Sequence, residues 1–371
     1  MFITVLKADG FKNLEDVMIR PHPKYNLITG LNAQGKTNLL ESIWLMTGCK
    51  SFRGSKDRDN IKLDGERMDI GIRFDDGRRE QSIEYKLSKE NIKLKDLKVN
   101  GVPMKNTRGL FQRFKAVVFT PDDVQLIKGS PEKRRTFIDL CCCQLDHRCL
   151  NILRDYENVT EQRNNLLKLI AQGRQSINDL DIWDTQAAAI GSMLSEKRED
   201  YVKKLSEVCS KLYSSIAGED EKLTIEYSSN VFGKEIPKGK DSKSAAAVYA
   251  FKLNSNINDD VRLGYTLYGA HRDDILIKIN GLNIKDFGSQ GQIKTAALVL
   301  KLGQAEIYYK KIEQAPVVLL DDVMGELDKN RQRLVLDIVK DMQVFITTCN
   351  EQSVTDMAAG SVFKISGGRV I

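Results

Sequence analysis

The chain has 371 residues, of which 41% are hydrophobic and 29% are charged, a balance typical of a soluble globular protein. This length exceeds what one ordinary hydrophobic core organises, so we expect two domains or one domain with a large insertion. The formal net charge of +6 permits a nucleic-acid partner without requiring one. No apolar stretch approaches the length of a membrane span and the N-terminus lacks a signal-peptide pattern, so we expect no membrane association.

Seven cysteines are spread along the chain, and an odd number in a chain of this length favours a reducing compartment. We therefore expect a cytoplasmic protein. Cys141-Cys142-Cys143 with His147 allows a metal-site hypothesis. Three consecutive side chains on a helix point about 100° apart, however, and no paired C-x-x-C is present. We predict that these cysteines are buried as small hydrophobic side chains.

The first 48 residues contain a phosphate-binding motif. Strands are predicted at 2–6, 17–20 and 24–28. The third strand runs into Gly30-Leu31-Asn32-Ala33-Gln34-Gly35-Lys36-Thr37, which fits the P-loop pattern G-x-x-x-x-G-K-[ST] without a mismatch. Apolar residues at helical spacing follow, up to Gly48. Because both the strand and the helix are present, we predict that the chain binds a nucleoside triphosphate.

Each residue type in this loop suits a phosphate group. Glycines permit backbone turns that other residues resist, so that successive N–H groups point into a hollow of phosphate size. The following helix adds the positive end of its dipole. Lys36 supplies a compact cation for the outer phosphates, and the Thr37 hydroxyl is suited to ligating Mg²⁺.

The next hundred residues read mainly as β-structure. A polar and basic loop at 50–58 comes first, and strands at 70–74, 81–87 and 97–99 follow. The last of these runs into Asn100-Gly101, a strong hairpin signal. A short apolar strand at 116–119 ends at Thr120-Pro121.

From about residue 132 to 215 the pattern changes to helix. Apolar residues keep a broken spacing of three and four, and a polar break at 173–181 divides them into two runs. Two long amphipathic helices with a short link suggest an antiparallel helical arm. Alternatively, these helices cover one face of the sheet.

The last 150 residues alternate between strands and helices. Strands are predicted at 223–227, 275–279 and 282–284, and a helical turn at 248–253. Ser289-Gln290-Gly291-Gln292 opens a helix. The continuous apolar run 317–320, typical of a central parallel strand, ends in Asp321-Asp322. A helix at 329–342 and a strand at 344–348 come next.

The P-loop and the two carboxylates are expected to meet at one site, because ligands of an open parallel sheet bind at the carboxyl ends of its strands. We predict that Asp321 holds Mg²⁺ opposite Thr37, directly or through water. Asp322 is then placed to orient and polarise the attacking water. The expected catalytic residues are Asp322 and Lys36.

The order of these motifs resembles that of ABC-type ATPase heads, and the long helical insertion is closer to SMC-like proteins than to transporters. Several stretches resemble the RecF family of bacterial recombination mediators over nearly the whole chain. They are residues 30–41, Lys128-Gly129-Ser130-Pro131 with Arg134-Arg135, Gly269-Ala270-His271-Arg272-Asp273-Asp274, and Leu319-Leu320-Asp321-Asp322-Val323 with Glu326-Leu327-Asp328.

This resemblance implies an α/β fold: an ABC-type P-loop ATPase head, with a parallel sheet core and an antiparallel β portion, that carries an inserted helical arm or lid. We expect the head at residues 1–131 and 266–371 and the mainly helical arm at 132–265. ATP and Mg²⁺ are the implied cofactors, bound in cis by residues 30–37 and Asp321. Ser289 and Gly291, with Gln292, would reach the γ-phosphate of a second copy, and Asp328 would lie at the seam of an ATP-dependent homodimer.

The resemblance also implies partners and activity. RecF-like proteins bind DNA of duplex character, particularly near gaps, act with RecR and RecO to load recombinase, and hydrolyse ATP slowly under DNA stimulation. Two departures from other ABC heads fit slow turnover: Asp322 replaces the usual Glu, and Thr348 stands where many heads have His. Residues 120–123 occupy the place of a Gln-loop without matching one.

Two basic clusters are the expected DNA contacts, since such side chains neutralise backbone phosphates without reading sequence. For any single member the alternative is a solvated surface side chain, and Arg134-Arg135 would equally pair with acidic groups inside the protein. Residues 271–274 are expected to form an internal polar network, and a hydrolytic role for His271 is disfavoured because no triad accompanies it. The two clusters are Lys50, Arg53, Lys56 and Arg58, and Lys128, Lys133, Arg134 and Arg135.

Three other functions compete with a DNA-holding ATPase of recombinational repair. An ABC-type energy-coupling subunit of a transporter is disfavoured by the size and place of the helical insertion. An SMC-like structural head without a direct DNA role is disfavoured because the arm is too short for a long coiled coil. A P-loop nuclease or kinase lacks a further carboxylate cluster or an acceptor pocket in the sequence.

Overall fold

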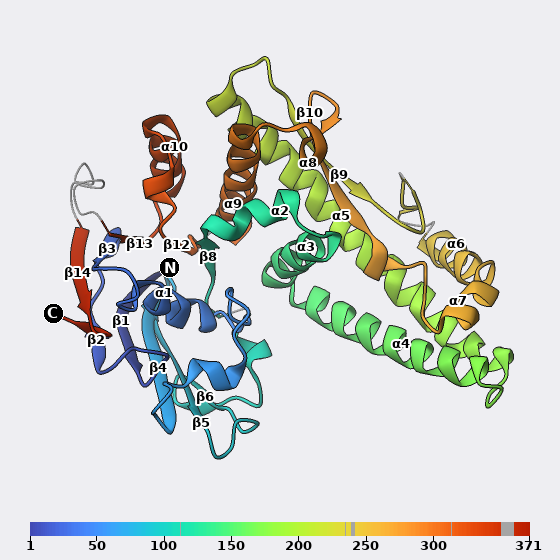
Figure 1. Cartoon of the computed structure of the whole chain (residues 1–371), viewed down its shortest axis with the longest axis horizontal. Coiled ribbons are helices and arrows are strands. Elements are labelled where there is room, and N and C mark those ends of the chain that lie inside the picture. Colours follow the sequence, from blue (N-terminus) through green and yellow to red (C-terminus); the bar gives the residue numbers. More distant parts are fainter. Residues whose placement is uncertain (112, 234, 239–241, 313, 350–359) are drawn as a thin grey trace. The chain divides into compact units, whose positions relative to one another are not determined.

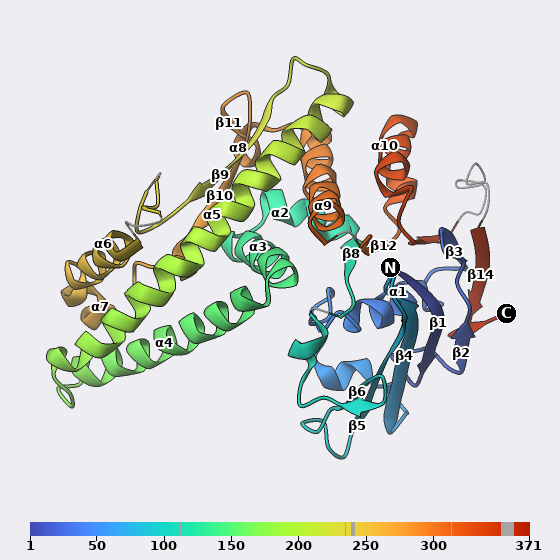
Figure 2. The same cartoon turned by 180° about the vertical axis from the view of Figure 1, so that it is seen from behind.

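The structure is a computed structural model of the whole chain, and it describes all residues except 112, 234, 239–241, 313 and 350–359. The chain forms two compact units, residues 1–123 with 301–371 and residues 124–300. Figures 1 and 2 label their elements from opposite sides. The boundaries fall within the short helix η3 (Pro121–Val124) and within α9 (Gln290–Ile312).

These boundaries differ from the expected ones at 131/132 and 265/266. β10 (Asp274–Ile279) pairs antiparallel along its whole length with β9 (Leu223–Ser228). This pairing joins residues beyond 265 to the predicted arm. α3 (Pro131–Leu145) also packs against β10. Residues 266–300 therefore belong to the second unit.

The core of the first unit is a six-stranded sheet with the order β15-β14-β3-β13-β12-β8. All neighbours are parallel except the terminal β14–β15 pair. β8, β12 and β13 are buried at every position, which confirms the predicted central strand at 317–320. The strands are β3 (Tyr25–Thr29), β8 (Ala116–Phe119), β12 (Val317–Leu320), β13 (Val344–Thr348), β14 (Gly360–Ser366) and β15 (Arg369–Val370).

A second sheet of the first unit is antiparallel, with the order β2-β1-β4-β5-β6-β7. Burial alternates along β4 and β5, as expected when one face of a sheet is solvated. The Asn100-Gly101 hairpin joins β6 and β7, and both residues have positive φ. The strands are β1 (Phe2–Asp9), β2 (Val17–Ile19), β4 (Arg67–Asp75), β5 (Glu80–Ser88), β6 (Asp96–Val99) and β7 (Val102–Pro103).

Helices complete the first unit. α1 (Lys36–Leu45) follows the P-loop, and its apolar residues Leu39, Leu40 and Ile43 are fully buried. α10 (Lys329–Val339) begins after the short helix η7 (Met324–Glu326). Two further 3₁₀ helices are η1 (Asp57–Asn60) and η2 (Thr107–Leu110).

The second unit is mainly helical. α4 (His147–Ala171) and α5 (Asp181–Ala217) pack against each other and are joined by a short link containing η4 (Ile177–Leu180), as the predicted helical arm requires (Figures 1 and 2). α5 also packs on β9, in a three-stranded sheet of order β11-β10-β9. The remaining elements are α2 (Gln125–Lys128), α6 (Ser242–Asn254), α7 (Ile257–Leu263), η6 (Ala270–Arg272), β11 (Leu282–Asn283) and α8 (Ile284–Phe287).

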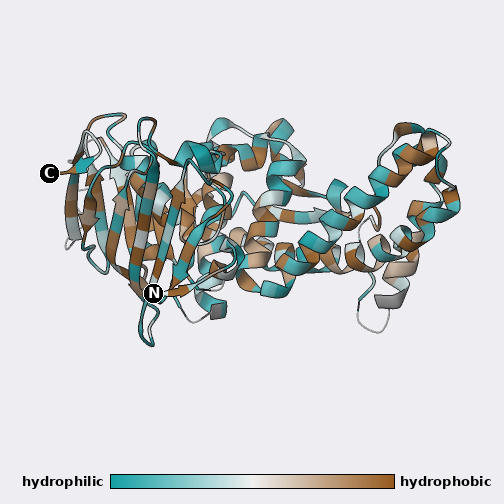
Figure 3. Cartoon of the chain, turned by 90° about the horizontal axis from the view of Figure 1, so that it is seen from below, coloured by the Kyte–Doolittle hydropathy of each residue, from teal (hydrophilic) through white to brown (hydrophobic). Residues whose placement is uncertain are grey.

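Hydrophobic and hydrophilic residues alternate along the long helices of the second unit (Figure 3). Cys141, Cys142 and Cys143 are buried on α3, as predicted. The fully buried Arg163 forms one ion pair with Asp184 and another with Asp260. Within the described part of the chain, no helix combines the length and the apolar character needed to cross a membrane.

Candidate nucleotide-binding site

The P-loop connects β3 to α1 in the first unit. Gly30 and Gly35 have φ of 144° and 115°, conformations that other residues rarely adopt. A Cβ on Gly30 would lie 2.3 Å from the carbonyl oxygen of Ile365, and one on Gly35 would lie 2.8 Å from Oδ1 of Asn13. Both positions therefore require glycine.

Lys36 is the buried cation of this loop, only 5% exposed. Its ammonium donates to the carbonyl oxygens of Gly30 (2.9 Å) and Leu31 (3.0 Å) and lies 3.2 Å from Sγ of Cys349. Among the described residues all of these partners are neutral. A buried ammonium without a carboxylate fits the phosphate oxygens of a nucleotide, because buried charges need a counter-charge.

Asp321 follows β12, and the P-loop follows β3. Only β13 lies between these two parallel strands in the sheet, so their carboxyl ends are close together. Oδ1 of Asp321 accepts hydrogen bonds from Thr37 Oγ1 (2.8 Å), at the start of α1, and from Thr347 Oγ1 (3.0 Å), on β13. Burial raises the pKa of Asp321, the two hydroxyl bonds oppose this, and the neighbouring Asp322 adds to it. A desolvated carboxylate next to a hydroxyl oxygen is a donor set that suits Mg²⁺.

Asp322 has a backbone conformation uncommon outside glycine, with φ of 52°. Its N–H donates to Thr347 Oγ1 (2.8 Å), so the hydroxyl on β13 fixes both residues of the acidic pair. The side chain is half-buried at the carboxyl end of β12. Strained positions of this kind concentrate at functional sites.

Ser289 caps α9, in the second unit. Its Oγ accepts from the N–H of Gln292 (3.2 Å), and Oε1 of Gln292 accepts from the N–H of Ser289 (2.8 Å). This reciprocal pair is a capping box. Ser289 and Gly291 are exposed, whereas Gln292 also donates to Glu221 (2.9 Å). The role of this motif toward a second copy of the chain stays a prediction.

Asp328 caps α10 and accepts from the N–H groups of Asn330 and Arg331, both at 3.0 Å. The bond from Arg331 is the main reason that the pKa of Asp328 is lowered. Its place at a dimer seam remains a prediction.

The basic clusters belong to different units. Lys50, Arg53, Lys56 and Arg58 are exposed in the first unit. In the second unit Lys128 and Lys133 are exposed and Arg135 is half-buried, with Nη1 donating to the carbonyl oxygen of Asp273 (2.7 Å).

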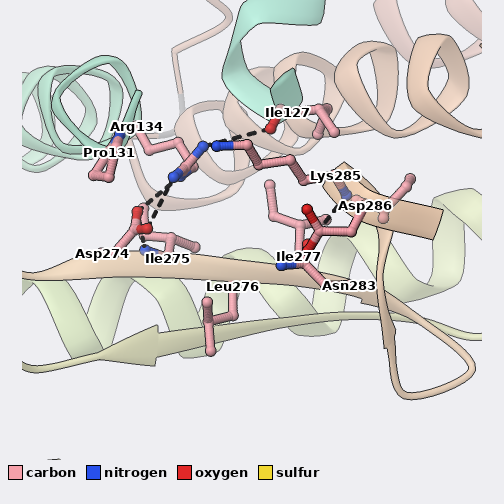
Figure 4. Close-up of a pocket in the computed structure, with 11 residues that line it drawn as sticks. Ile127, Pro131, Arg134, Asp274, Ile275, Leu276, Ile277, Asn283, Lys285 and Asp286 are labelled. Carbon is pink, nitrogen blue, oxygen red and sulfur yellow. Dashed lines mark hydrogen bonds and ion pairs between the residues drawn. The ribbon is translucent and has the colours of Figure 1, made fainter. Parts of the chain in front are cut away.

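Arg134 differs from these neighbours (Figure 4). It is 6% exposed and forms a bidentate pair with Asp274 at 2.7 and 2.8 Å. Its Nη1 also donates to the carbonyl oxygen of Gly129 (3.0 Å). The guanidinium therefore forms its bonds inside the second unit. The expected DNA contact at Arg134 is wrong, and the alternative, an ion pair inside the protein, is confirmed.

Residues 271–274 belong to an internal polar network, as predicted. Asp273 is fully buried and accepts from Ser195 Oγ (2.9 Å) and from the N–H of Asn230 (2.6 Å). The ring of His271 lies between Tyr156 Oη (2.8 Å) and the carbonyl oxygen of Thr266 (3.0 Å). Burial lowers the pKa of His271 to about 4.

Several residues that support the P-loop were not anticipated. Asn13 Nδ2 donates to the carbonyl oxygen of Ala33 (3.2 Å), and Asn38 Nδ2 donates to Asn13 Oδ1 (2.7 Å). The N–H of Gly368, in the C-terminal hairpin, donates to the carbonyl oxygen of Gln34 (3.1 Å). The sequence signal for these residues was weak, because Asn38 directly follows Thr37 of the P-loop pattern while no local pattern links Asn13 or Gly368 to the loop.

The fold and the site define a class of protein. Residues 2–368 match the family model of the RecF/RecN/SMC N terminal domain. The Smc head domain of Pyrococcus furiosus, solved with the C-terminal domain of ScpA, has a TM-score of 0.56 over 100% of this chain and 96% of that one. At 16% identity this likeness shows the fold alone, that of an ABC-type ATPase head.

Full-length relatives narrow the class. The DNA replication and repair protein RecF of Alkaliphilus oremlandii is 36% identical over 372 residues, 100% of each chain. That of Acetivibrio thermocellus is 35% identical over 354 residues, 95% of this chain and 94% of the relative. A structure of the recombination mediator protein RecF-ATP in the RecFOR pathway is 34% identical, with a TM-score of 0.90 over 100% of this chain and 97% of that one. The chain belongs to the RecF family, as the motifs indicated.

Proposed function

We propose that this chain is a slow, DNA-stimulated ATPase of recombinational repair that dimerises on ATP and holds duplex or gapped DNA. The observation that carries the proposal is the hydrogen bond of 2.8 Å between Thr37 and Asp321, which brings the P-loop and the acidic strand end into one site. A solved RecF relative bound to ATP, 34% identical, supports the identity of the nucleotide.

In this proposal residues 30–37 cradle the phosphates, and Lys36 balances their charge from its buried position. Thr37 and Asp321 would hold Mg²⁺, which when bound supplies positive charge against the outer phosphates. Asp322 orients the attacking water. Its side chain is one methylene shorter than Glu and positions water less well, which supports slow turnover.

Ser289, Gly291 and Gln292 act in trans on the γ-phosphate of the second copy, with Asp328 at the seam. The exposure of Ser289 and Gly291 supports this role. The second unit serves as the arm or lid. RecR and RecO are the proposed protein partners, supported by the RecFOR pathway named for the solved relative.

DNA is bound through cations that neutralise backbone phosphates, all of them exposed except the half-buried Arg135. These contacts are Lys50, Arg53, Lys56, Arg58, Lys128, Lys133 and Arg135. Coverage of the whole chain by RecF relatives argues against the energy-coupling subunit of a transporter.

Fluorescence anisotropy of a labelled gapped duplex, with and without Mg-ATP at two salt concentrations, tests this function. We expect tight, salt-sensitive binding that requires ATP in the wild-type chain and is lost in Lys36→Ala. Equal DNA affinity with and without Mg-ATP would contradict the proposed dependence on nucleotide. No DNA binding in any condition would contradict direct DNA recognition.

A further inference from the structure

A basic hollow lies beside the P-loop within the first unit. Its volume is about 620 Å³, and its lining includes four cations, Lys12, Arg53, Arg58 and Lys89, but one carboxylate, Asp59. Among the described residues, Arg53, Arg58 and Lys89 have no carboxylate within ion-pair distance. The nearest neutral partner of Lys89 is the carbonyl oxygen of Leu63, at 2.8 Å. The hollow therefore has an excess of positive charge, which fits an anionic ligand.

Hydrogen bonds connect this hollow to the P-loop. Arg53 Nη1 donates to Asn38 Oδ1 (3.0 Å), Asn38 donates to Asn13 (2.7 Å), and Asn13 donates to the carbonyl oxygen of Ala33 (3.2 Å). Asn38 directly follows Thr37 on α1. If Arg53 exchanges Asn38 for another partner, the side-chain amides of Asn38 and Asn13 can shift. The hydrogen bond from Asn13 to the P-loop carbonyl of Ala33 then changes.

The backbone that carries Arg53 is held in place. Glu41 is fully buried on α1 and accepts from Lys12 Nζ and from Ser51 Oγ, both at 2.5 Å. The same hydroxyl of Ser51 accepts from the N–H groups of Arg53 (3.1 Å) and Ser55 (3.2 Å). The loop is thus anchored, and the exposed side chain of Arg53 is the part that is free to exchange partners.

We propose that this hollow binds a phosphodiester of a nucleic-acid backbone, and that the phosphate competes with Asn38 for Arg53. The inference rests on the proposed DNA-binding function and adds Lys89 to the site, together with a route from DNA to nucleotide. The bond from Arg53 to Asn38 joins a charged donor to a neutral acceptor. A phosphate carries a full negative charge and accepts two bonds from the planar guanidinium, so it displaces the amide oxygen. Asn38 and Asn13 then relax their hold on Ala33.

Reciprocity follows from this competition. If DNA binding at Arg53 changes the affinity of the P-loop for nucleotide, then bound nucleotide changes the affinity for DNA by the same factor. The hollow therefore contributes two separable quantities. Affinity for DNA comes from Arg53, Arg58 and Lys89, since the charge of Lys12 is balanced by Glu41. Coupling between DNA and nucleotide comes from the exchange of partners at Arg53.

Three variants separate these quantities, measured as anisotropy of a labelled gapped duplex with and without Mg-ATP at several salt concentrations. Lys89→Ala is expected to weaken binding about tenfold and to reduce the salt slope by about one, because one phosphate contact is lost. Arg53→Lys keeps the charge but lacks the planar fork, so we expect near-normal affinity without nucleotide and a smaller ATP-induced change. Arg78→Ala, in the exposed β4–β5 turn outside the hollow, is the matched control.

The inference is overturned if Lys89→Ala behaves like Arg78→Ala, or if Arg53→Lys retains the full ATP-induced change. In either case ATP-dependent binding by the wild-type chain would leave the proposed function intact. If the wild-type chain binds no DNA, both fail.

Discussion

Lys36 is a buried cation whose partners among the described residues are neutral, so the fold leaves its counter-charge to a ligand. Replacing it with alanine removes the cation that the triphosphate oxygens require. We expect Lys36→Ala to weaken ATP binding by about 100-fold, corresponding to the loss of one or two charge-assisted hydrogen bonds. Titration with a fluorescent ATP analogue measures this, with Arg78→Ala as the control. Unchanged affinity would remove Lys36 from the site.

In the proposed function Asp322 acts at a later step than Lys36. The variant Asp322→Asn keeps the size of the side chain but cannot accept a proton from water. We expect ATP binding within about twofold of wild type and hydrolysis lowered by about 100-fold, the usual range for a lost general base. A phosphate-release assay measures turnover, and a wild-type rate would show that another group orients the water.

His271 gives the second unit a pH dependence. Its pKa of about 4 lies below the ordinary 6.5, so the unfolded chain takes up the proton first as pH falls. Stability is therefore lost between about pH 6.5 and pH 4, by about 2 kcal/mol at pH 5. Denaturant unfolding at pH 7 and pH 5 measures the loss, which His271→Gln should reduce. An equal loss in the variant would assign it to other groups.

Arg134 and Arg135 show where residue-level prediction from sequence ends. They are adjacent and chemically identical, yet one is buried against Asp274 and the other is half-buried. The pairing partner of Arg134 lies 140 residues away, so no local pattern separates the two. Lys36, Thr37 and Asp321 were predictable because the P-loop pattern and the end of an apolar strand are local signals.

At the scale of elements, the C-terminal hairpin of β14 and β15 contacts the P-loop and stabilises its conformation. The N–H of Gly367 donates to Oε1 of Gln34 (2.5 Å), and the N–H of Gly368 donates to the carbonyl oxygen of the same residue (3.1 Å). Ile365 leaves space only for a glycine at Gly30. The last residues of the chain therefore help to shape the phosphate-binding loop.

Gly368→Ala tests this support. Gly368 has φ of 81°, and a Cβ there would lie 1.8 Å from the carbonyl oxygen of Asn13. Gly77 has a similar φ of 84°, and a Cβ there would meet nothing within 4 Å, so Gly77→Ala carries the backbone strain without the clash. We expect Gly77→Ala to cost about 1 kcal/mol, and Gly368→Ala to cost at least about 2 kcal/mol and to weaken ATP binding. Equal effects on unfolding and on ATP affinity would contradict the supporting role.

The elements were predictable where periodicity was strong. The central strands, the P-loop helix and the Asn100-Gly101 hairpin follow from local patterns. The predicted helical run from 132 onward is instead divided at Asp146, which caps α4 through the N–H of Arg148. The turn expected at 248–253 is part of the longer α6, whose alanine-rich sequence has little periodicity. The hairpin of β14 and β15 was not anticipated, because its short strands are fixed by pairing with β3 and with each other.

At the scale of the whole molecule, the division into two units depends on contacts between distant segments. α6, α7 and η6 lie between β9 and β10 in the sequence, so the pairing of these strands, and with it the boundary near residue 300, is not a local property. The class of fold was predictable because the order of motifs is itself specific. The boundaries were not, because composition does not change at 123 or at 300.

Dimerisation is the property of the whole molecule that the Ser289 motif controls in this account. We expect Ser289→Arg to bind ATP normally and to stay monomeric, because the large cation obstructs the second copy. Ser289→Ala loses the same helix cap at a cost of about 1 kcal/mol without adding bulk, so it is the matched control. Light scattering with Mg-ATP measures the dimer fraction, and an unchanged fraction in Ser289→Arg would refute the trans role.

The central claim is that ATP makes two copies of this chain hold one DNA. The most direct measurement is the mass of the complex with a gapped duplex, by size-exclusion chromatography with light scattering, with and without Mg-ATP. The account predicts two chains of 41.9 kDa on each duplex with Mg-ATP and no stable complex without it. One chain per duplex, or the same mass in both conditions, would contradict it.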